Sequence, residues 1–587
     1  MAKKTFFQGA VVLAAAGVII KALGAVFRIP LGNMISDLGM GYYQTAYTIY
    51  VMFLVLSNSG LPVAISRMVS ERIAVGDHGS AHRVFRMSFG ILFIIGFASF
   101  YICFFQTELL LGFFSNMGAS AFAVKAIAPA LLIVPLMAAF RGYFQGMQNM
   151  RPTANSQVSE QFFRVATGLA LAYLLLPKGE EFAAAGAAFG ATSGSIFGLI
   201  TVAAIYFMYR RGQKARGDRA PGGRPSDARG TGAGGTGSAG ATGADAAGGS
   251  AAHGGSGADA RAARRRGRKE PAGEIMLRIF AIAVPITIGA AIMPIMNTID
   301  LKIISTRLDY LGWQGNEVLK AYGQLAGFAN PLINLPQILT QAVAMSLVPA
   351  VAAAFKSGDT QFLRHNISLG LRTAIIIGLP CAFGMMAIPG NILLLLYPAE
   401  PQAALSAAPF LFILAFGIIF LSTVQTLTGV LQGIGKQMIP VANLSVGVIV
   451  KVAVSLSLIA IPSVNIKGVA VGTVCAYIVA AALNLLAVKR YTGTDFDIRL
   501  TFVKPIVAAA TMCLTVILAQ KACAALIGGS GFAGNAASTL FAVCAGAAVY
   551  IAMIFVSGAI TEEELALLPK GAKLAKLSAK FRRPKKG

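Results

Sequence analysis

Charged residues are scarce in this sequence. Asp, Glu, Lys and Arg make up 12% of its 587 residues, whereas a soluble domain carries about 25%. Hydrophobic residues make up 56%. Apolar runs of about eighteen residues or more recur along the chain, and each is long enough to cross a bilayer as a helix. The composition excludes a soluble globular protein and predicts an all-α polytopic membrane protein.

The sequence also lacks the alternation of apolar and polar residues that marks the strands of an outer-membrane barrel. We therefore predict fourteen transmembrane helices. In chain order they lie near 6–27, 43–66, 85–105, 122–147, 156–176, 183–209, 275–301, 321–354, 367–396, 407–430, 438–461, 467–488, 502–524 and 535–558. The eighth is long and contains prolines, and we expect it to bend at Pro331 or Pro336.

Motifs of catalysis are missing. There is no Walker A loop, no HExxH sequence and no Ser/His/Asp set, and the six cysteines form no CxxC pair. The four histidines all lie in predicted loops: His78, His82, His253 and His365. We therefore expect a transporter that is not an enzyme and holds no metal or cofactor. Without an ATP site, the membrane potential or a gradient of Na⁺ or H⁺ remains as the driving force.

Positive charge is concentrated in two segments. The formal net charge of the chain is +26. Thirteen of its Lys and Arg residues lie in 210–269, and eight lie in 570–586. Neither segment carries a nucleic-acid-binding motif, so anionic lipid headgroups are the better partner. With the N-terminus inside, the short loops on the inner side hold fourteen Lys or Arg and those on the outer side hold six. The positive-inside rule therefore predicts that both termini are cytoplasmic.

A Gly/Ala-rich segment of low complexity, 212–272, divides the predicted helices into six and eight. Its composition cannot bury enough apolar surface to fold, which is typical of a flexible linker. The predicted organisation is an N-terminal lobe 1–209, a basic linker 210–273, a C-terminal lobe 274–490, two extra helices in 491–558 and a basic cytoplasmic tail 559–587.

The two lobes share two sequence patterns. "GYFQGMQNMRPTAN" (142–155) matches "GVLQGIGKQMIPVAN" (429–443), and "SERIAVGDHGSAHRVFRMSFG" (70–90) matches "AAAFKSGDTQFLRHNISLG" (352–370). The offset between the partners is similar in both pairs. We therefore predict a parallel internal repeat.

The chain resembles the polysaccharide-biosynthesis branch of the multidrug/oligosaccharidyl-lipid/polysaccharide exporter superfamily, and within it the stage V sporulation protein B group and the lipid II flippases of Gram-positive bacteria. The stretches that carry the resemblance are "FFQGAVVLAAAGVIIKALGAVFRIPLG", "SNSGLPVAISRMVSE", "RGYFQGMQNMRPTANSQVSEQFFR" and "QTLTGVLQGIGKQMIP". It implies two six-helix lobes around a central cavity, two further C-terminal helices, and alternating access. It also implies export of a polyprenyl-diphosphate-linked sugar, above all lipid II for peptidoglycan.

One motif of that family is modified here. Lipid II flippases carry Arg-x-Leu-Gly and a second Arg in the first helix, and this chain has Lys21-Ala22-Leu23-Gly24 and Arg28. It has neither the acidic residue after that helix nor the Arg in the second helix that the Gram-negative members have. These departures favour the sporulation-protein-like branch.

A polar stripe opens the predicted fifth helix. Gln157, Glu160, Gln161 and Arg164 are spaced i, i+3, i+4 and i+7, which places them on one helix face. Glu160 and Arg164 can pair at i, i+4. The stripe either lines a cavity or lies in the cytoplasmic headgroup region, and the family resemblance favours the cavity.

Other polar residues inside or beside apolar runs complete the candidate substrate-binding set, because a charge within a membrane helix requires a protein or aqueous environment. They are Lys21, Arg28, Arg67, Arg141, Asn297 and Asp300. Arg28, Arg67 and Arg141 also fit a topology signal or a helix end. Asp300 could lie near Lys302, bind a coupling cation, or sit at the outer interface.

The predicted function is therefore a flippase in the bacterial cytoplasmic membrane that acts as a monomer on a lipid-linked oligosaccharide, with cell-wall synthesis enzymes as further partners. The alternatives within transport are another cargo, such as a teichoic-acid, exopolysaccharide or spore-cortex intermediate, and a cation-coupled drug antiporter. A membrane glycosyltransferase would need a large acidic outer loop, whereas the longest here is 302–320. A scaffold for a cell-wall complex would not need charges within its helices.

Overall fold

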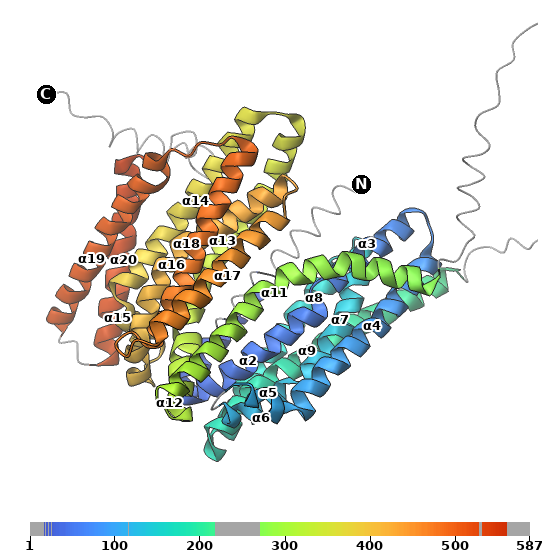
Figure 1. The fold of residues 1–587 in the computed structure, drawn as a ribbon, viewed down its shortest axis with the longest axis horizontal. Coiled ribbons are helices and arrows are strands. Elements are labelled where there is room, and N and C mark those ends of the chain that lie inside the picture. Colours follow the sequence, from blue (N-terminus) through green and yellow to red (C-terminus); the bar gives the residue numbers. More distant parts are fainter. Residues whose placement is uncertain are drawn as a thin grey trace, which may run out of the picture.

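The computed structural model describes residues 17, 19–20, 23–24, 26–114, 117–217, 271–527 and 531–559, and these are mostly helical with no strand among them. Figure 1 shows two helix bundles side by side. The N-terminal bundle contains α2 (Asp37–Asn58), α3 (Leu61–Ala74), α4 (His78–Phe105), α5 (Thr107–Gly112), α6 (Ala121–Ile127), α7 (Pro129–Gly146), α8 (Arg151–Leu175) and α9 (Glu180–Gly217). Residues 26–34 are also helical and precede α2.

The C-terminal bundle follows the predicted linker, which lies outside the described residues. Its helices are α11 (Ala272–Tyr310), α12 (Gly315–Tyr322), α13 (Asn330–Ser357), α14 (Thr360–Ala387), α15 (Pro389–Leu396), α16 (Pro401–Gly433), α17 (Met438–Ile459), α18 (Lys467–Thr492), α19 (Lys504–Ile527) and α20 (Phe532–Ser557). The last two pack on each other and on α14, at the outer flank of this bundle (Figure 1).

Twelve helical stretches among the described residues are long and apolar enough to cross a membrane, which confirms the all-α polytopic fold. Each coincides with one of the predicted segments. Two of the fourteen predicted segments are not among the twelve. α8 has 25 residues, but the polar stripe lowers its hydropathy, and most of 6–27 lies outside the described residues.

The internal repeat is visible in the backbone. Both Gly76 and Gly358 have positive φ, at 77° and 75°, a conformation that glycine adopts without strain. The aspartate that follows each of them caps the next helix: Asp77 accepts from the Ser80 amide at 2.8 Å, and Asp359 accepts from the Phe362 amide at 2.9 Å. The two halves therefore turn in the same way at the matching sequence positions.

Prolines shape the two helices that lie between the bundles. α11 contains Pro285 and Pro294 and is visibly bent in Figure 1. It packs against α2 and α3 of the N-terminal bundle and against α17 of its own bundle. The long eighth segment contains a π-helix, η3 (Gly323–Ala329), which ends two residues before Pro331, and α13 continues through Pro336, so the bend expected at Pro331 or Pro336 stays a prediction.

The two bundles are in close contact at one end, which we call the sealed end and define by Asn33, Gly41, Gly323 and Tyr397. The Asn33 amide donates to the Leu396 carbonyl at 2.7 Å, and the Tyr397 ring packs on Gly32. At Gly41 and Gly323 the backbones of α2, α12 and η3 approach so closely that neither position has room for a Cβ. An added Cβ at Gly323 would lie 2.1 Å from the Asp37 carbonyl oxygen.

Gly323→Ala should therefore open the sealed end. The extra methyl group meets backbone that cannot rotate away, so we expect a loss of about 1–3 kcal/mol from the contact between α2 and η3. Hydrogen–deuterium exchange should rise in 37–48 and in 318–329. Gly90→Ala in α4 is a matched control, because nothing lies within 4 Å of its added Cβ. Unchanged exchange at both segments would show that the close approach does not hold the bundles together.

Candidate functional site

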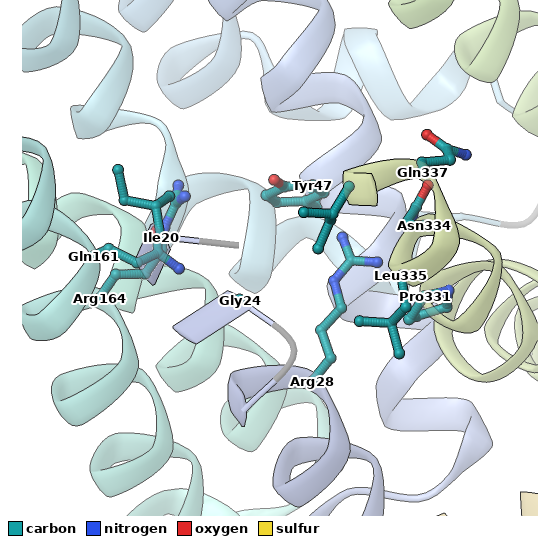
Figure 2. A pocket seen from close by; sticks show the side chains of 11 residues that line it. Ile20, Gly24, Arg28, Tyr47, Gln161, Arg164, Pro331, Asn334, Leu335 and Gln337 are labelled. Carbon is teal, nitrogen blue, oxygen red and sulfur yellow. The ribbon is translucent and has the colours of Figure 1, made fainter. Parts of the chain in front are cut away.

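A cavity of about 390 Å³ lies between the two bundles. Figure 2 shows Gln161 and Arg164 on one side, Asn334 and Gln337 on the other, and Arg28 and Tyr47 between them. The described residues that line it are Ile20, Gly24, Arg28, Tyr47, Gln161, Arg164, Pro331, Asn334, Leu335, Gln337 and Ile338. Among these described residues are two guanidinium groups and no carboxylate.

Aromatic side chains of α2 hold the two arginines. The Arg28 guanidinium lies 5.5 Å from the centre of the Tyr47 ring, a cation–π arrangement. Arg164 lies close to the Tyr50 side chain of α2, and the Glu160 carboxylate is among its electrostatic neighbours. Arg28 is thus placed by a neutral aromatic ring, whereas Arg164 has tyrosines and a carboxylate near it, and that carboxylate is bonded to Arg141.

Small residues on α9 set the position of α8, the helix that carries Arg164. Gly186, Gly190, Gly194 and Gly198 repeat every four residues and line up on one face. An added Cβ at Gly194 would lie 2.4 Å from the carbonyl oxygen of Glu160, so the two helices are in backbone contact there. This contact fixes the depth at which Arg164 enters the cavity.

The opposite wall is neutral. Asn334 and Gln337 come from α13, and the Gln337 amide oxygen accepts from the Gln425 amide of α16 at 3.4 Å. Thr340, one turn further along α13, donates to the Gln425 amide oxygen at 2.6 Å. The cavity is therefore cationic on the side of the N-terminal bundle and uncharged on the side of the C-terminal bundle.

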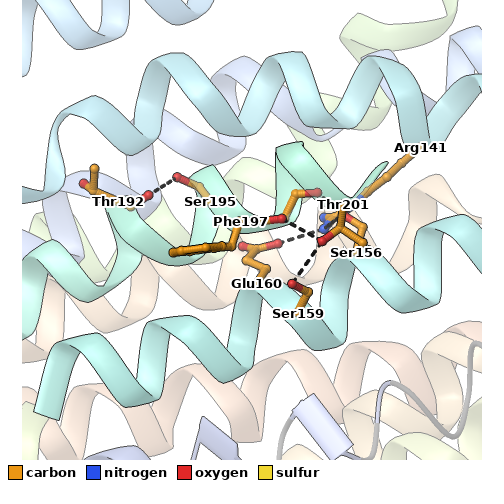
Figure 3. A network of polar contacts seen from close by, with 9 residues as sticks. Arg141, Ser156, Ser159, Glu160, Thr192, Ser195, Phe197 and Thr201 are labelled. Carbon is orange, nitrogen blue, oxygen red and sulfur yellow. Dashed lines mark hydrogen bonds and ion pairs between the residues drawn. The ribbon is translucent and has the colours of Figure 1, made fainter. Parts of the chain in front are cut away.

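The predicted pair between Glu160 and Arg164 is wrong. The Glu160 carboxylate instead accepts from the Arg141 guanidinium of α7 at 2.9 Å (Figure 3). Arg141 also donates to the Ser156 hydroxyl at 2.8 Å, and that hydroxyl donates to the Gly198 carbonyl at 2.8 Å. Spacing along one helix favoured an i, i+4 pair, but a neighbouring helix supplies a guanidinium that satisfies the carboxylate.

Glu160 and Arg141 therefore join α7 and α8, with Ser156 extending the network to α9. Their side chains are 18% and 13% exposed. Removing one partner leaves the other charge poorly solvated, so Glu160→Ala should lower the unfolding free energy by about 3 kcal/mol. Thermal unfolding of the purified protein in detergent measures this.

Arg67→Ala is the matched control for that measurement. Arg67 pairs with Glu71 at 3.1 Å, but its side chain is 65% exposed, so its loss should change stability by no more than about 0.5 kcal/mol. If Glu160→Ala unfolded at the same temperature as this control, the network in Figure 3 would not contribute to the stability of the protein.

The remaining predicted site residues lie elsewhere. Arg67 is in a surface network in which Glu71 also pairs with Arg278 of α11 at 2.7 Å. Gln157 is partly buried and Asn297 is exposed, and neither is among the residues that line the cavity. Lys21 lies outside the described residues. Of the predicted set, the structure brings Arg28 and Arg164 together, with Gln161 beside them.

Asp300 has a partner that the sequence analysis missed. Lys451 of α17 donates to its carboxylate at 2.6 Å, and the Lys451 side chain is only 2% exposed. Lys302 faces another way, with its ammonium group on the Phe113 carbonyl and ring. A lysine in the middle of the apolar run 438–461 was the signal for this pair, the same signal that singled out Lys21.

The arrangement is suited to an anion with a polar, uncharged extension. Two guanidinium groups supply several hydrogen-bond donors that match phosphate oxygens, and the amides opposite both donate and accept. No group of three or more His, Cys, Asp or Glu that could hold a metal ion occurs in the part of the chain that the structure describes.

Two protein-family models match the sequence. Residues 6–220 match the family described as polysaccharide biosynthesis protein, and residues 260–534 match the family described as lipid II flippase MurJ. The two matches divide at the segment that the sequence analysis identified as a linker.

Three proteins of Bacillus subtilis (strain 168) are similar over most of their length. The uncharacterized membrane protein YabM is 27% identical over 97% of this chain and 96% of its own. Stage V sporulation protein B is 24% identical over 97% of this chain and 98% of its own. Lipid II flippase MurJ is 26% identical over 84% of each chain.

Two solved structures share the fold. Lipid II flippase MurJ in an inward closed conformation has a TM-score of 0.63 and 13% identity, over 92% of this chain and 98% of that one. An inward-facing multidrug resistance MATE family transporter of the MOP superfamily has a TM-score of 0.59 and 14% identity, over 80% and 98%.

Proposed function

We propose that this chain, which belongs to the polysaccharide-biosynthesis branch of the multidrug/oligosaccharidyl-lipid/polysaccharide exporter superfamily, is a flippase for a polyprenyl-diphosphate-linked cell-wall precursor. Lipid II is the first candidate cargo. The observation that carries the proposal is the pair of guanidinium groups, Arg28 and Arg164, in a cavity between the bundles whose described lining holds no carboxylate.

The physical logic starts from the charge of a diphosphate. Such a headgroup cannot cross hydrocarbon unaided, because its desolvation is too unfavourable. A cavity with two arginines replaces water as hydrogen-bond donor in a site of low dielectric constant, where charge-assisted hydrogen bonds are strong. The apolar lipid tail can remain in the bilayer while the headgroup passes between the bundles.

The sealed end supports alternating access. With the orientation predicted from charge, Asn33 and Tyr397 lie toward the outer face, so the contact between Asn33 and Leu396 closes the cavity to the outside. The headgroup then enters from the cytoplasm, and opening of the sealed end releases it on the outer side. Both termini are cytoplasmic in this arrangement, in a bacterial cytoplasmic membrane.

Export of an anion from a negative interior is favoured by the membrane potential, since about 2.3 kcal/mol is available per charge per 100 mV. We therefore assign the driving force to the potential, with a Na⁺ or H⁺ gradient as the alternative. Both bundles that line the cavity belong to the same chain, which makes a monomer sufficient for transport.

A second cargo of the same chemical class is favoured by the relatives. Stage V sporulation protein B matches nearly the whole chain, as does YabM. Another lipid-linked polysaccharide precursor is therefore the runner-up. A drug antiporter for organic cations is disfavoured, because Arg28 and Arg164 would repel such a substrate.

Depletion of the protein in its own bacterium tests the proposal. We expect one polyprenyl-diphosphate-linked precursor to accumulate on the cytoplasmic leaflet, where an added membrane-impermeant reagent cannot reach its sugar. Re-expression of the wild-type chain should release it. If every lipid-linked precursor kept its normal distribution in depleted cells, the chain would not be their flippase.

A further inference from the structure

Two rows of neutral hydrogen-bonding side chains run along the C-terminal bundle beyond the arginines. Asn334, Gln337 and Gln341 lie at i, i+3 and i+7 of α13, and Gln425, Thr428 and Gln432 repeat the same spacing on α16. This spacing places each row on one helix face. α13 and α16 pack against each other, so the rows are neighbours.

The rows lead from the cavity that contains the arginines to a second cavity. Gln337 lines the first cavity and accepts at 3.4 Å from Gln425, which lines a second cavity of about 200 Å³. The second cavity is lined by Gln341, Gln425, Thr428 and Gln432 together with small and apolar residues. A third, of about 400 Å³, shares Thr428 and Gln432 with it and reaches α11 and α17.

These two further cavities have no charged residue in their described lining. Asn334, Gln341 and Gln432 are exposed at the cavity walls, although they lie on helices that cross the membrane. Thr340, whose hydroxyl joins α13 to α16 through Gln425, is buried in the helix contact. Exposed amides beside these uncharged cavities instead provide hydrogen bonds for a neutral polar group.

We propose that the amide rows of α13 and α16 form a subsite for the glycan part of the lipid-linked substrate, while Arg28 and Arg164 hold its diphosphate. The inference rests on the proposed function and adds the class of group bound. A sugar hydroxyl both donates and accepts, as an amide does, so neutral amides match it in a way that arginines do not. The diphosphate is then bound at the arginines, and the glycan is bound further along α13 and α16.

Binding measurements on the purified full chain in nanodiscs test this. The probes are farnesyl diphosphate and farnesyl diphosphate carrying a disaccharide. The variant is Gln341→Leu/Gln432→Leu, which removes one amide from each row. Each lost hydrogen bond should weaken binding roughly 3- to 10-fold for the glycosylated probe alone. Gln361→Leu, at the exposed start of α14, is the matched control and should bind both probes as wild type does.

The outcomes separate the two proposals. If the double variant loses affinity for the glycosylated probe alone, at an unchanged melting temperature, the result supports the glycan subsite. If it loses affinity for both probes equally, or for neither, the glycan subsite is overturned and the flippase proposal stays intact. If the wild-type chain bound neither probe, the flippase proposal itself would fail and the subsite with it. If wild type bound both probes with the same affinity, the glycan would have no subsite here.

Discussion

Arg164→Ala should abolish transport while the protein still accumulates in the membrane. Arg164 faces the cavity from α8, and the described cavity lining offers no carboxylate to compete for its guanidinium. Two charge-assisted hydrogen bonds to a diphosphate contribute about 1.5–3 kcal/mol each, so their loss should weaken binding by roughly 100-fold or more. Arg164→Lys keeps the positive charge but cannot form bidentate hydrogen bonds to a phosphate, so it should retain part of the activity.

Complementation of a flippase-null strain measures the effect, together with the amount of lipid-linked precursor that copurifies with each variant. Arg151→Ala is the matched control: the same substitution on the same helix, at its exposed first turn. Full transport by Arg164→Ala would show that the cavity between the bundles is not the headgroup site.

Lys451→Met should produce the largest loss of stability. Lys451 is almost completely buried, and its removal leaves the Asp300 carboxylate, which is 15% exposed, without a counter-charge. Breaking a buried ion pair from one side lowers stability by about 3–5 kcal/mol. We expect a correspondingly large fall in the melting temperature in detergent, and reduced amounts in the membrane.

The double variant Asp300→Leu/Lys451→Met separates the pair from the packing of its side chains. When both charges are replaced by apolar groups, no uncompensated charge remains, so most of the lost stability should return. A double variant as unstable as Lys451→Met alone would mean that packing around α17, and not the charge pair, explains the loss.

Most of the fold could be predicted because the membrane imposes a simple rule on sequence. Backbone groups in hydrocarbon must bond internally, so each long apolar run becomes a helix. The turn after Gly76 and its counterpart at Gly358 were also readable, since a glycine followed by a capping aspartate is a local signal. What failed was partner choice between helices.

Glu160 shows why. The sequence offered Arg164 four residues away on the same helix. The structure instead pairs Glu160 with Arg141, which lies on the neighbouring helix α7. Lys451 was not singled out from the sequence at all, and its depth in an apolar run would not have identified Asp300 as its partner. The cationic half of the cavity was predictable from charge in apolar runs. The amide half was not, since glutamines in membrane helices fit several roles.

Transfer of a fluorescent polyprenyl-diphosphate-linked sugar across vesicles that contain only this protein tests the central proposal most directly. The vesicles would carry a potential, negative in the compartment from which the sugar starts, and a membrane-impermeant quencher would report the leaflet. We expect wild-type protein to move the lipid to the opposite leaflet, Arg151→Ala to match it, and Arg164→Ala to leave the lipid where it started. Transfer by wild type no faster than in protein-free vesicles would contradict the assignment of this chain as a flippase.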